Sequence, residues 1–178
     1  MKKYAIFVTM ILALVIFTSG CTDTQNQNTK TYSANGISFN YPDSWVPAST
    51  SVSNAVVSFG DPKSVNASTG NVNTLLIVQK VAMPSNMTLK QAFDSNFAKV
   101  AAQNPSYQLI DNTTTTVDGT TAYINTHKIN ANGVQKEEKA VWIEKNGNIY
   151  VILMGTIPDA FNNQQANFDA VIKSFHVM

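Results

Sequence analysis

The sequence predicts an α+β fold, an α-β-α sandwich with a central antiparallel sheet and helices on both faces. Short Asp-Gly and Asn-Gly turns at 118–119, 132–133 and 146–147 separate β-rich segments, a pattern that favours an antiparallel meander. The segment 149–154 is apolar on both faces and therefore needs a layer on each side. Amphipathic helical patterns before and after the meander can supply the two layers.

The chain before the first helix predicts a hairpin and two strands. Asn35-Gly36 supplies a two-residue turn within 31–41, and Ile37, Phe39 and Tyr41 alternate after it. Pro42-Asp43 ends the hairpin, and Trp45, two residues further on, is expected to be buried. The remaining elements are strands at 55–59 and 74–81, separated by a polar loop over 65–73.

A clear helix signal begins at Thr88. Threonine is a preferred N-cap, and Gln91 three residues later completes a capping box. Asn104-Pro105 ends the helix. The expected core-facing stripe consists of Leu89, Phe93, Phe97 and Val100. Asp159 is expected to cap the C-terminal helix, which carries Phe161, Phe168, Ile172 and Phe175.

The meander is predicted to contain strands at 107–115, 120–129, 134–145 and 148–156. The third of these alternates acidic and basic residues: Lys136, Glu137, Glu138, Lys139, Glu144 and Lys145. Two carboxylates could serve a glycosidase. Charges alternating along a strand more simply indicate a solvated sheet edge with cross-strand ion pairs.

Residues 1–20 have the pattern of a signal peptide. Lys2 and Lys3 precede fourteen nearly unbroken apolar residues, 4–17. As a helix this segment would span about 21 Å, short of a hydrocarbon core of roughly 30 Å. The sequence therefore predicts export.

Cys21, the only cysteine, follows the signal segment in the run Thr18-Ser19-Gly20-Cys21. This run resembles the lipobox of bacterial and archaeal lipoproteins, although Thr18 departs from the usual aliphatic residue. The resemblance implies a diacylglyceryl lipid on Cys21, which would anchor the protein to the outer face of the cytoplasmic membrane. The alternative is an ordinary cleaved signal peptide. Residues 21–31 are expected to form a lipid-anchored polar tether, and residues 32–178 the folded domain.

The charge composition argues against nucleic-acid binding. All twelve basic residues are lysines, and removal of Lys2 and Lys3 with the signal peptide leaves ten lysines against eleven acidic residues. Nucleic-acid-binding proteins need a basic face, commonly with arginine forks. The expected partners are a membrane, through lipid on Cys21, and an unidentified envelope protein.

Two terminal motifs of the expected domain resemble those of PsbP-like domains. Residues 36–45 (GISFNYPDSW) are similar to the family opening G-x-x-F-x-Y-P-x-x-W, and residues 168–175 (FDAVIKSF) to its closing F-x-x-I-x-x-S-F. The resemblance implies an α-β-α sandwich and a role in binding or assembly. It carries no functional residue across, because the matching positions are core and turn residues.

The sequence contains no constellation that indicates catalysis, a cofactor or a metal. His127 and His176 are the only histidines, lack the spacing of metal ligands, and are expected at the surface or rim. Asn66, Asn86 and Asn112 match the N-glycosylation pattern, but no more often than chance would give.

The predicted function is that of a non-enzymatic envelope lipoprotein, a binding or assembly accessory for a membrane or cell-surface complex. The alternative is an extracellular protein that binds a small ligand. A third possibility, an enzyme, would require His127 beside an acid or hydroxyl in a cleft.

Overall fold

The structure, a computed structural model, describes residues 28–67, 69–131 and 133–178. The expected signal peptide, Cys21 and most of the tether lie outside these residues. Among the described helices none is long and apolar enough to cross a membrane. Every described strand and helix lies between Thr29 and Val177, and so does every residue of the two hydrophobic clusters. A chain beginning at residue 22 therefore contains this whole core.

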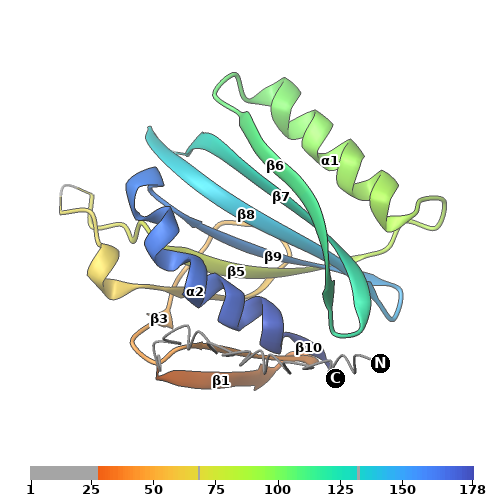
Figure 1. Cartoon of the computed structure of the whole chain (residues 1–178), viewed down its shortest axis with the longest axis horizontal. Helices are drawn as coiled ribbons and strands as arrows, with labels where there is room; N and C mark the ends of the chain where they lie inside the picture. The colour runs from red at the N-terminus through yellow and green to blue at the C-terminus, as the bar shows by residue number, and fades with distance from the viewer. Residues whose placement is uncertain (1–27, 68, 132) are drawn as a thin grey trace, which may run out of the picture.

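The larger sheet has seven antiparallel strands in the order β3-β4-β5-β9-β8-β7-β6 (Figure 1). Its strands are β3 (Val46–Pro47), β4 (Ala55–Gly60), β5 (Leu75–Ala82), β6 (Gln108–Val117), β7 (Thr120–Ala131), β8 (Val134–Lys145) and β9 (Asn148–Thr156). The last four form the predicted meander. β9 lies between β5 and β8, which confirms that this apolar strand is central.

Two turns of the meander use residues with positive φ at both central positions. Asp118 and Gly119 have φ of 49° and 76°, and Asn146 and Gly147 have φ of 53° and 70°. This left-handed backbone matches the twist of the flanking strands and suits Asn, Asp and Gly. The turn chemistry therefore accounts for the meander and its short connections.

A second sheet of three strands has the order β1-β2-β10, formed by β1 (Thr29–Ala34), β2 (Ile37–Pro42) and β10 (His176–Val177). The hairpin begins at Thr29 rather than at residue 31, because Thr29–Thr31 pair with Asn40–Pro42. Thr29 and Lys30 were expected only in the tether on account of the polarity of this segment, but backbone pairing requires no apolar side chain. The two-residue strand β10 was not predicted.

Two α-helices, α1 (Leu89–Gln103) and α2 (Pro158–Ser174), accompany the sheets, with a short 3₁₀ helix at Pro62–Ser64. The capping box of α1 is confirmed: Thr88 Oγ1 accepts from Gln91 N at 3.2 Å, and Thr88 N donates to Gln91 Oε1 at 2.8 Å. The prediction that Asp159 caps α2 is wrong. Pro158 occupies the first helical position, so Asp159 lies inside the first turn, where its charge favours the helix dipole.

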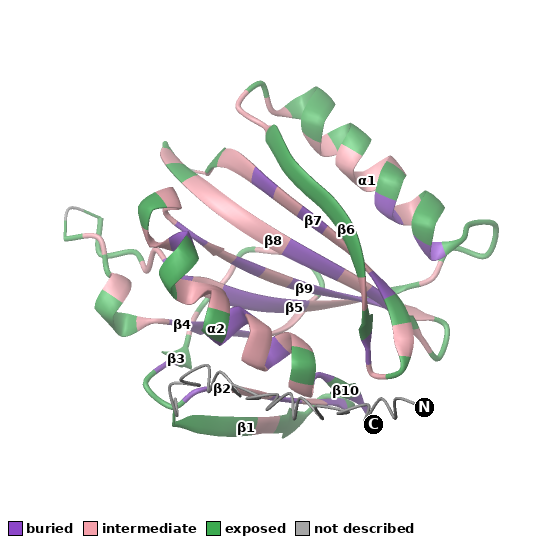
Figure 2. Ribbon diagram, in the orientation of Figure 1, coloured by how far each residue is buried: buried purple, intermediate pink, exposed green. Residues whose placement is uncertain are grey.

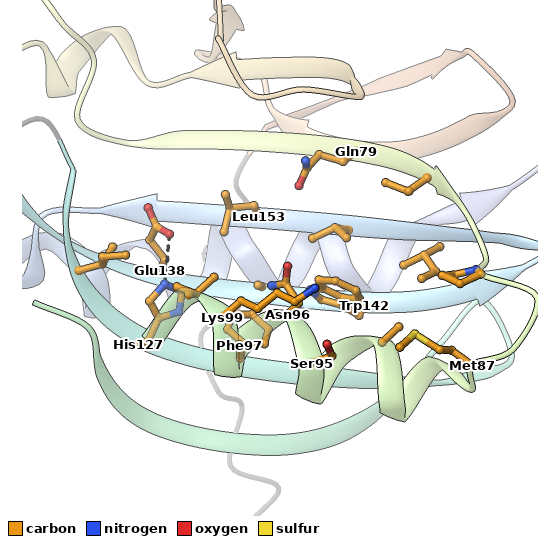
Figure 3. Close-up of a pocket in the computed structure, with 18 of the residues that line it drawn as sticks. Gln79, Met87, Ser95, Asn96, Phe97, Lys99, His127, Glu138, Trp142 and Leu153 are labelled. Atoms are coloured by element: carbon orange, nitrogen blue, oxygen red, sulfur yellow. Dashed lines mark ion pairs between the residues drawn. The ribbon is translucent and has the colours of Figure 1, made fainter. Parts of the chain in front are cut away.

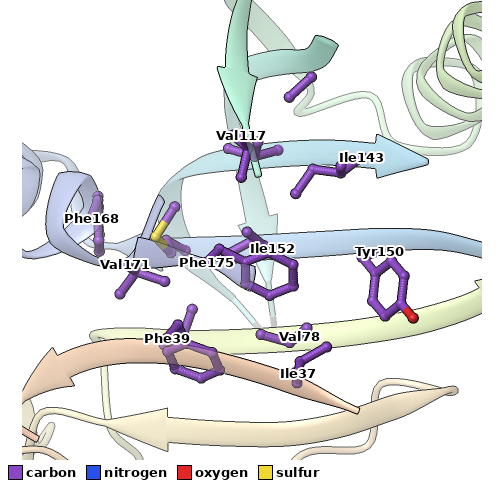
Figure 4. Close-up of a cluster of buried hydrophobic side chains, with 14 of the residues drawn as sticks. Ile37, Phe39, Val78, Val117, Ile143, Tyr150, Ile152, Phe168, Val171 and Phe175 are labelled. Atoms are coloured by element: carbon purple, nitrogen blue, oxygen red, sulfur yellow. The ribbon is translucent and has the colours of Figure 1, made fainter. Parts of the chain in front are cut away.

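The core consists of two hydrophobic clusters that share β9. Tyr150 and Ile152 belong to the larger cluster with Phe168 of α2 (Figure 4), whereas Ile149 and Val151 belong to the smaller one, with Leu89 of α1. Trp45 is 3% exposed within the larger cluster, as predicted. These packed helices and antiparallel strands confirm the α+β class.

Asp118 ties the C-terminus to the larger sheet. Its carboxylate accepts from Lys145 Nζ at 2.6 Å, from the Val177 amide at 3.1 Å, and lies 2.7 Å from His176 Nδ1. Burial alone raises the pKa of Asp118, but the hydrogen bonds from Lys145, His176 and Val177 outweigh it and lower the pKa from 3.8 to about 2. The resulting stabilisation is complete above the ordinary value and is lost as the pH falls towards about 2.

Candidate functional site

A cleft of about 680 Å³ lies between α1 and the larger sheet (Figure 3). Ile149, Val151 and Leu153 of β9 contribute apolar side chains to it. The helix supplies mixed side chains: Ala92, Ser95, Asn96, Phe97, Lys99 and Val100. This composition, mostly apolar with a few polar groups, is typical of binding sites.

The burial of α1 changes along its length. Leu89 and Phe93 near its start are buried, whereas Phe97 and Val100 are half-buried. Two residues that line the cleft, Val81 and Met87, are 38% and 42% exposed. The cleft therefore has apolar side chains that remain accessible to solvent.

His127 is 3% exposed at the cleft, so its predicted place at the surface or rim is wrong. It lies on β7 directly across from Glu138 of β8, and the rings of Phe97 and Tyr107 pack against it at 5.7 and 5.0 Å between centroids. The two aromatic rings come from α1 and from the chain before β6. Tertiary packing therefore buries a histidine that the isolated strand pattern leaves exposed.

A signal in the sequence could have found the pair of His127 and Glu138. Across the predicted Asn132-Gly133 turn, Ala131 pairs with Val134. Counting four residues outward along both strands brings His127 opposite Glu138. Paired residues lie on the same face of a sheet, so the turn alone predicts the contact.

Both ring nitrogens of His127 already have partners. Nδ1 lies 2.7 Å from Asn125 Oδ1, and Nε2 lies 3.3 Å from Glu138 Oε2. The Asn125 amide nitrogen donates to Tyr107 Oη at 3.0 Å and to Asn112 Oδ1 at 2.9 Å. Asn125 Oδ1 is thus the acceptor, and Nδ1 of His127 carries a proton.

This arrangement differs from that of a catalytic histidine. A general base uses one nitrogen to contact the acid that orients it and presents the other to the reacting group. In His127 the nitrogen opposite the acid is held by Asn125. The structure does place His127 beside an acid in a cleft, as the enzyme alternative requires. The engagement of both ring nitrogens better fits a buried polar network that fixes the strands around the cleft.

Gly155 makes room for Glu138. The two residues are paired across β9 and β8, and a Cβ on Gly155 would lie 3.0 Å from Glu138 Cγ. Such a contact is tighter than normal van der Waals packing, so the Glu138 side chain would have to move. Gly155 is therefore a positioning residue for the pair of His127 and Glu138.

We expect Gly155→Ala to lower the free energy of unfolding by about 1–2 kcal/mol, because displacing Glu138 leaves His127 with one partner fewer in a buried site. Chemical denaturation measures the loss. A double-mutant cycle supplies the control: in a Glu138→Ala background the same substitution should cost little. An equal cost in both backgrounds would contradict the steric origin.

The other candidate residues lie apart from this pair. His176 is exposed, as predicted, and contacts Asp118. The prediction that β8 is a sheet edge is wrong, because β7 and β9 flank it. Glu137 pairs with Lys128 at 3.7 Å, and as the strand neighbour of Glu138 it points to the opposite face. Cys21 lies outside the described residues, among which no three metal-ligating side chains of His, Cys, Asp or Glu gather.

One polar group at the cleft remains available: Lys99 forms no ion pair among the described residues. The indole nitrogen of Trp142 also has no hydrogen-bond partner, but this atom is buried. A buried donor without an acceptor costs about 1–3 kcal/mol.

The comparisons with solved structures agree on the fold. Cyanobacterial PsbP (CyanoP) from Synechocystis sp. PCC 6803 matches with a TM-score of 0.64 and 20% identity, over 90% of this chain and 99% of its own. LpqN of Mycobacterium tuberculosis, involved in cell envelope biogenesis, gives 0.58 and 14%, over 85% and 91%. The Ran-binding protein Mog1p of Saccharomyces cerevisiae gives 0.59 and 13%, over 85% and 96%.

At these identities the structural similarities show the fold alone. A search among curated proteins found no match. The family model for PsbP-like proteins matches residues 17–177, nearly the whole chain. This confirms the resemblance that the motifs at 36–45 and 168–175 suggested. The chain belongs to the PsbP-like protein family.

Proposed function

We propose that this protein is a non-enzymatic accessory of the cell envelope that binds a partner protein through the cleft beside α1. The cleft is the observation that carries the proposal. It combines an apolar floor on β9, exposed apolar residues Val81 and Met87, and a histidine whose two nitrogens are both engaged. Those features favour binding over turnover.

We further infer that α1 and α2 cover opposite faces of the larger sheet, as in an α-β-α sandwich. Neighbouring residues of a strand point to opposite faces. Ile149 and Val151 contribute to the cluster of α1, whereas Tyr150 and Ile152 contribute to that of α2. In this arrangement α2 packs on one face of the larger sheet through the larger hydrophobic cluster. α1 covers the other face less completely.

The lipid on Cys21 would place the cleft at the membrane surface. Anchoring and a short polar tether would hold the domain close to other envelope proteins and raise their effective concentration. Weak contacts at the cleft would then suffice for association. Mog1p is a Ran-binding protein and LpqN is involved in cell envelope biogenesis, and both roles agree with such an accessory.

A small ligand is the second candidate occupant of the cleft. Lys99 favours it, since a small molecule with a carbonyl or carboxylate group could accept a hydrogen bond from its ammonium group. The exposed apolar residues Val81 and Met87 favour the partner protein.

Photo-crosslinking in intact cells tests the proposal. A benzophenone amino acid at Val81, inside the cleft, is expected to capture one discrete envelope protein. The same probe at Thr29, on the exposed strand β1, serves as the matched control and should not capture it. In a Met87→Asp background the Val81 crosslink should weaken at least about tenfold, because a charge then faces the apolar contact.

A crosslinked product of equal strength at both positions, or none at Val81, would contradict a partner-binding cleft. A small-mass adduct at Val81, identified by mass spectrometry, would instead support the ligand-binding alternative.

A further inference from the structure

The four edges of the two sheets differ in how they are protected. Three show features that discourage pairing with another strand: β3 and β10 have two residues each, with Pro47 in β3, and β1 has six residues including Lys30. Short length, proline and lysine are common protections of sheet edges. The fourth edge, β6, has none of these three features; its pairing with β7 is irregular between Leu109 and Asp111, which leaves Asp111–Val117 as its regular stretch.

β6 is ten residues long and pairs only with β7. Eight of its residues are exposed, which gives a nearly continuous exposed ribbon in Figure 2. Leu109 and Ile110 are 52% and 49% exposed, and Asp111 is the one charged residue of the strand. α1 does not protect this strand, since its Phe93 packs on Tyr123 of β7 and Trp142 of β8.

We propose that β6 is a self-association edge that pairs antiparallel with β6 of a second copy of this chain. A long, exposed strand presents unpaired backbone N–H and C=O groups along its free side. Pairing two such strands about a two-fold axis would satisfy both rows and extend the sheet through both copies. The inference concerns a surface other than the cleft and does not depend on the proposed function.

The sequence of β6 is complementary to itself. A two-fold axis at Thr114, the middle residue of Asp111–Val117, would pair Thr114 with its own copy and Thr113 with Thr115, and cross-strand threonine pairs are favourable. Asp111 would then lie opposite Val117. The two Asp111 carboxylates would be about 20 Å apart along the strands, too far to repel strongly at ordinary ionic strength. This charge pattern favours a second copy over a partner of unknown sequence.

Sedimentation velocity on residues 22–178 tests the pairing. Over a series reaching about 1 mM, where weak edge contacts become populated, the wild-type mass should rise towards that of a dimer. Thr114→Lys should raise the dissociation constant by about tenfold or more, because two lysines would meet near the axis. Thr29→Lys, the same change on the exposed edge strand β1, is the control and should leave the dimer intact.

A second variant locates the axis. Thr114→Cys should form a disulfide-linked dimer under mild oxidation, since residues 22–178 contain no other cysteine. Thr29→Cys should not. A wild-type protein that stays monomeric throughout the series, or a dimer that Thr114→Lys leaves unchanged while circular dichroism shows the native fold, would overturn the proposal.

Discussion

Replacing Trp45 by alanine is expected to lower the free energy of unfolding by about 3–5 kcal/mol, the usual cost of truncating a large aromatic residue in a core. Trp45 is 3% exposed and belongs to the larger hydrophobic cluster, with Phe39 of β2 and Phe59 of β4. This cluster connects the two sheets. Loss of the indole would leave a cavity at the place where the hairpin joins the rest of the domain.

Urea denaturation followed by circular dichroism measures this effect. Val46→Ala is the matched control, because Val46 is the next residue and is 47% exposed; its cost should stay within about 0.5 kcal/mol. Fluorescence of a Trp142→Phe variant reports on Trp45 alone and should show the blue-shifted emission of a buried indole. Emission like that of free indole, or equal costs for Trp45→Ala and Val46→Ala, would contradict this account.

Cys21→Ser is expected to release the protein from membranes or to leave an unprocessed precursor. The serine hydroxyl differs from the thiol by one atom but does not receive the lipid, so the two acyl chains that would give stable anchoring are lost. Membrane fractionation and metabolic labelling with a fatty acid measure the result. All of the Cys21→Ser protein should lack the lipid label.

Thr22→Ala, one residue further on, is the control and should remain labelled and membrane-bound. If Cys21→Ser fractionates and migrates like the wild type, lipidation at Cys21 is wrong, and the segment would be an ordinary cleaved signal peptide.

Local chemistry in the sequence predicted much of the fold. The capping box of Thr88 and Gln91 and the turns at Asp118-Gly119 and Asn146-Gly147 act over a few residues, so their effect on structure is visible without tertiary context. Hydrophobic pattern placed β9 in the centre of the sheet because burial on both faces requires an uninterrupted apolar run.

The features that the sequence did not predict depend on contacts between residues far apart in the chain. β10 is too short to show a period, and it exists because Asp118 holds His176 and Val177 beside β2. His127 was placed at the surface because its burial depends on Phe97 and Tyr107, which are distant in sequence. The cleft arises from the incomplete burial of α1, which no local pattern of the helix predicts.

A test for turnover addresses the claim of a non-enzymatic binding domain most directly. We expect purified residues 22–178 to show no activity in a broad esterase, glycosidase and peptidase screen, because Asn125 and Glu138 occupy both nitrogens of His127. His127→Ala, screened in parallel and verified as folded, should behave identically. Reproducible turnover by the wild type that disappears in His127→Ala would contradict the account and assign the cleft to an enzyme.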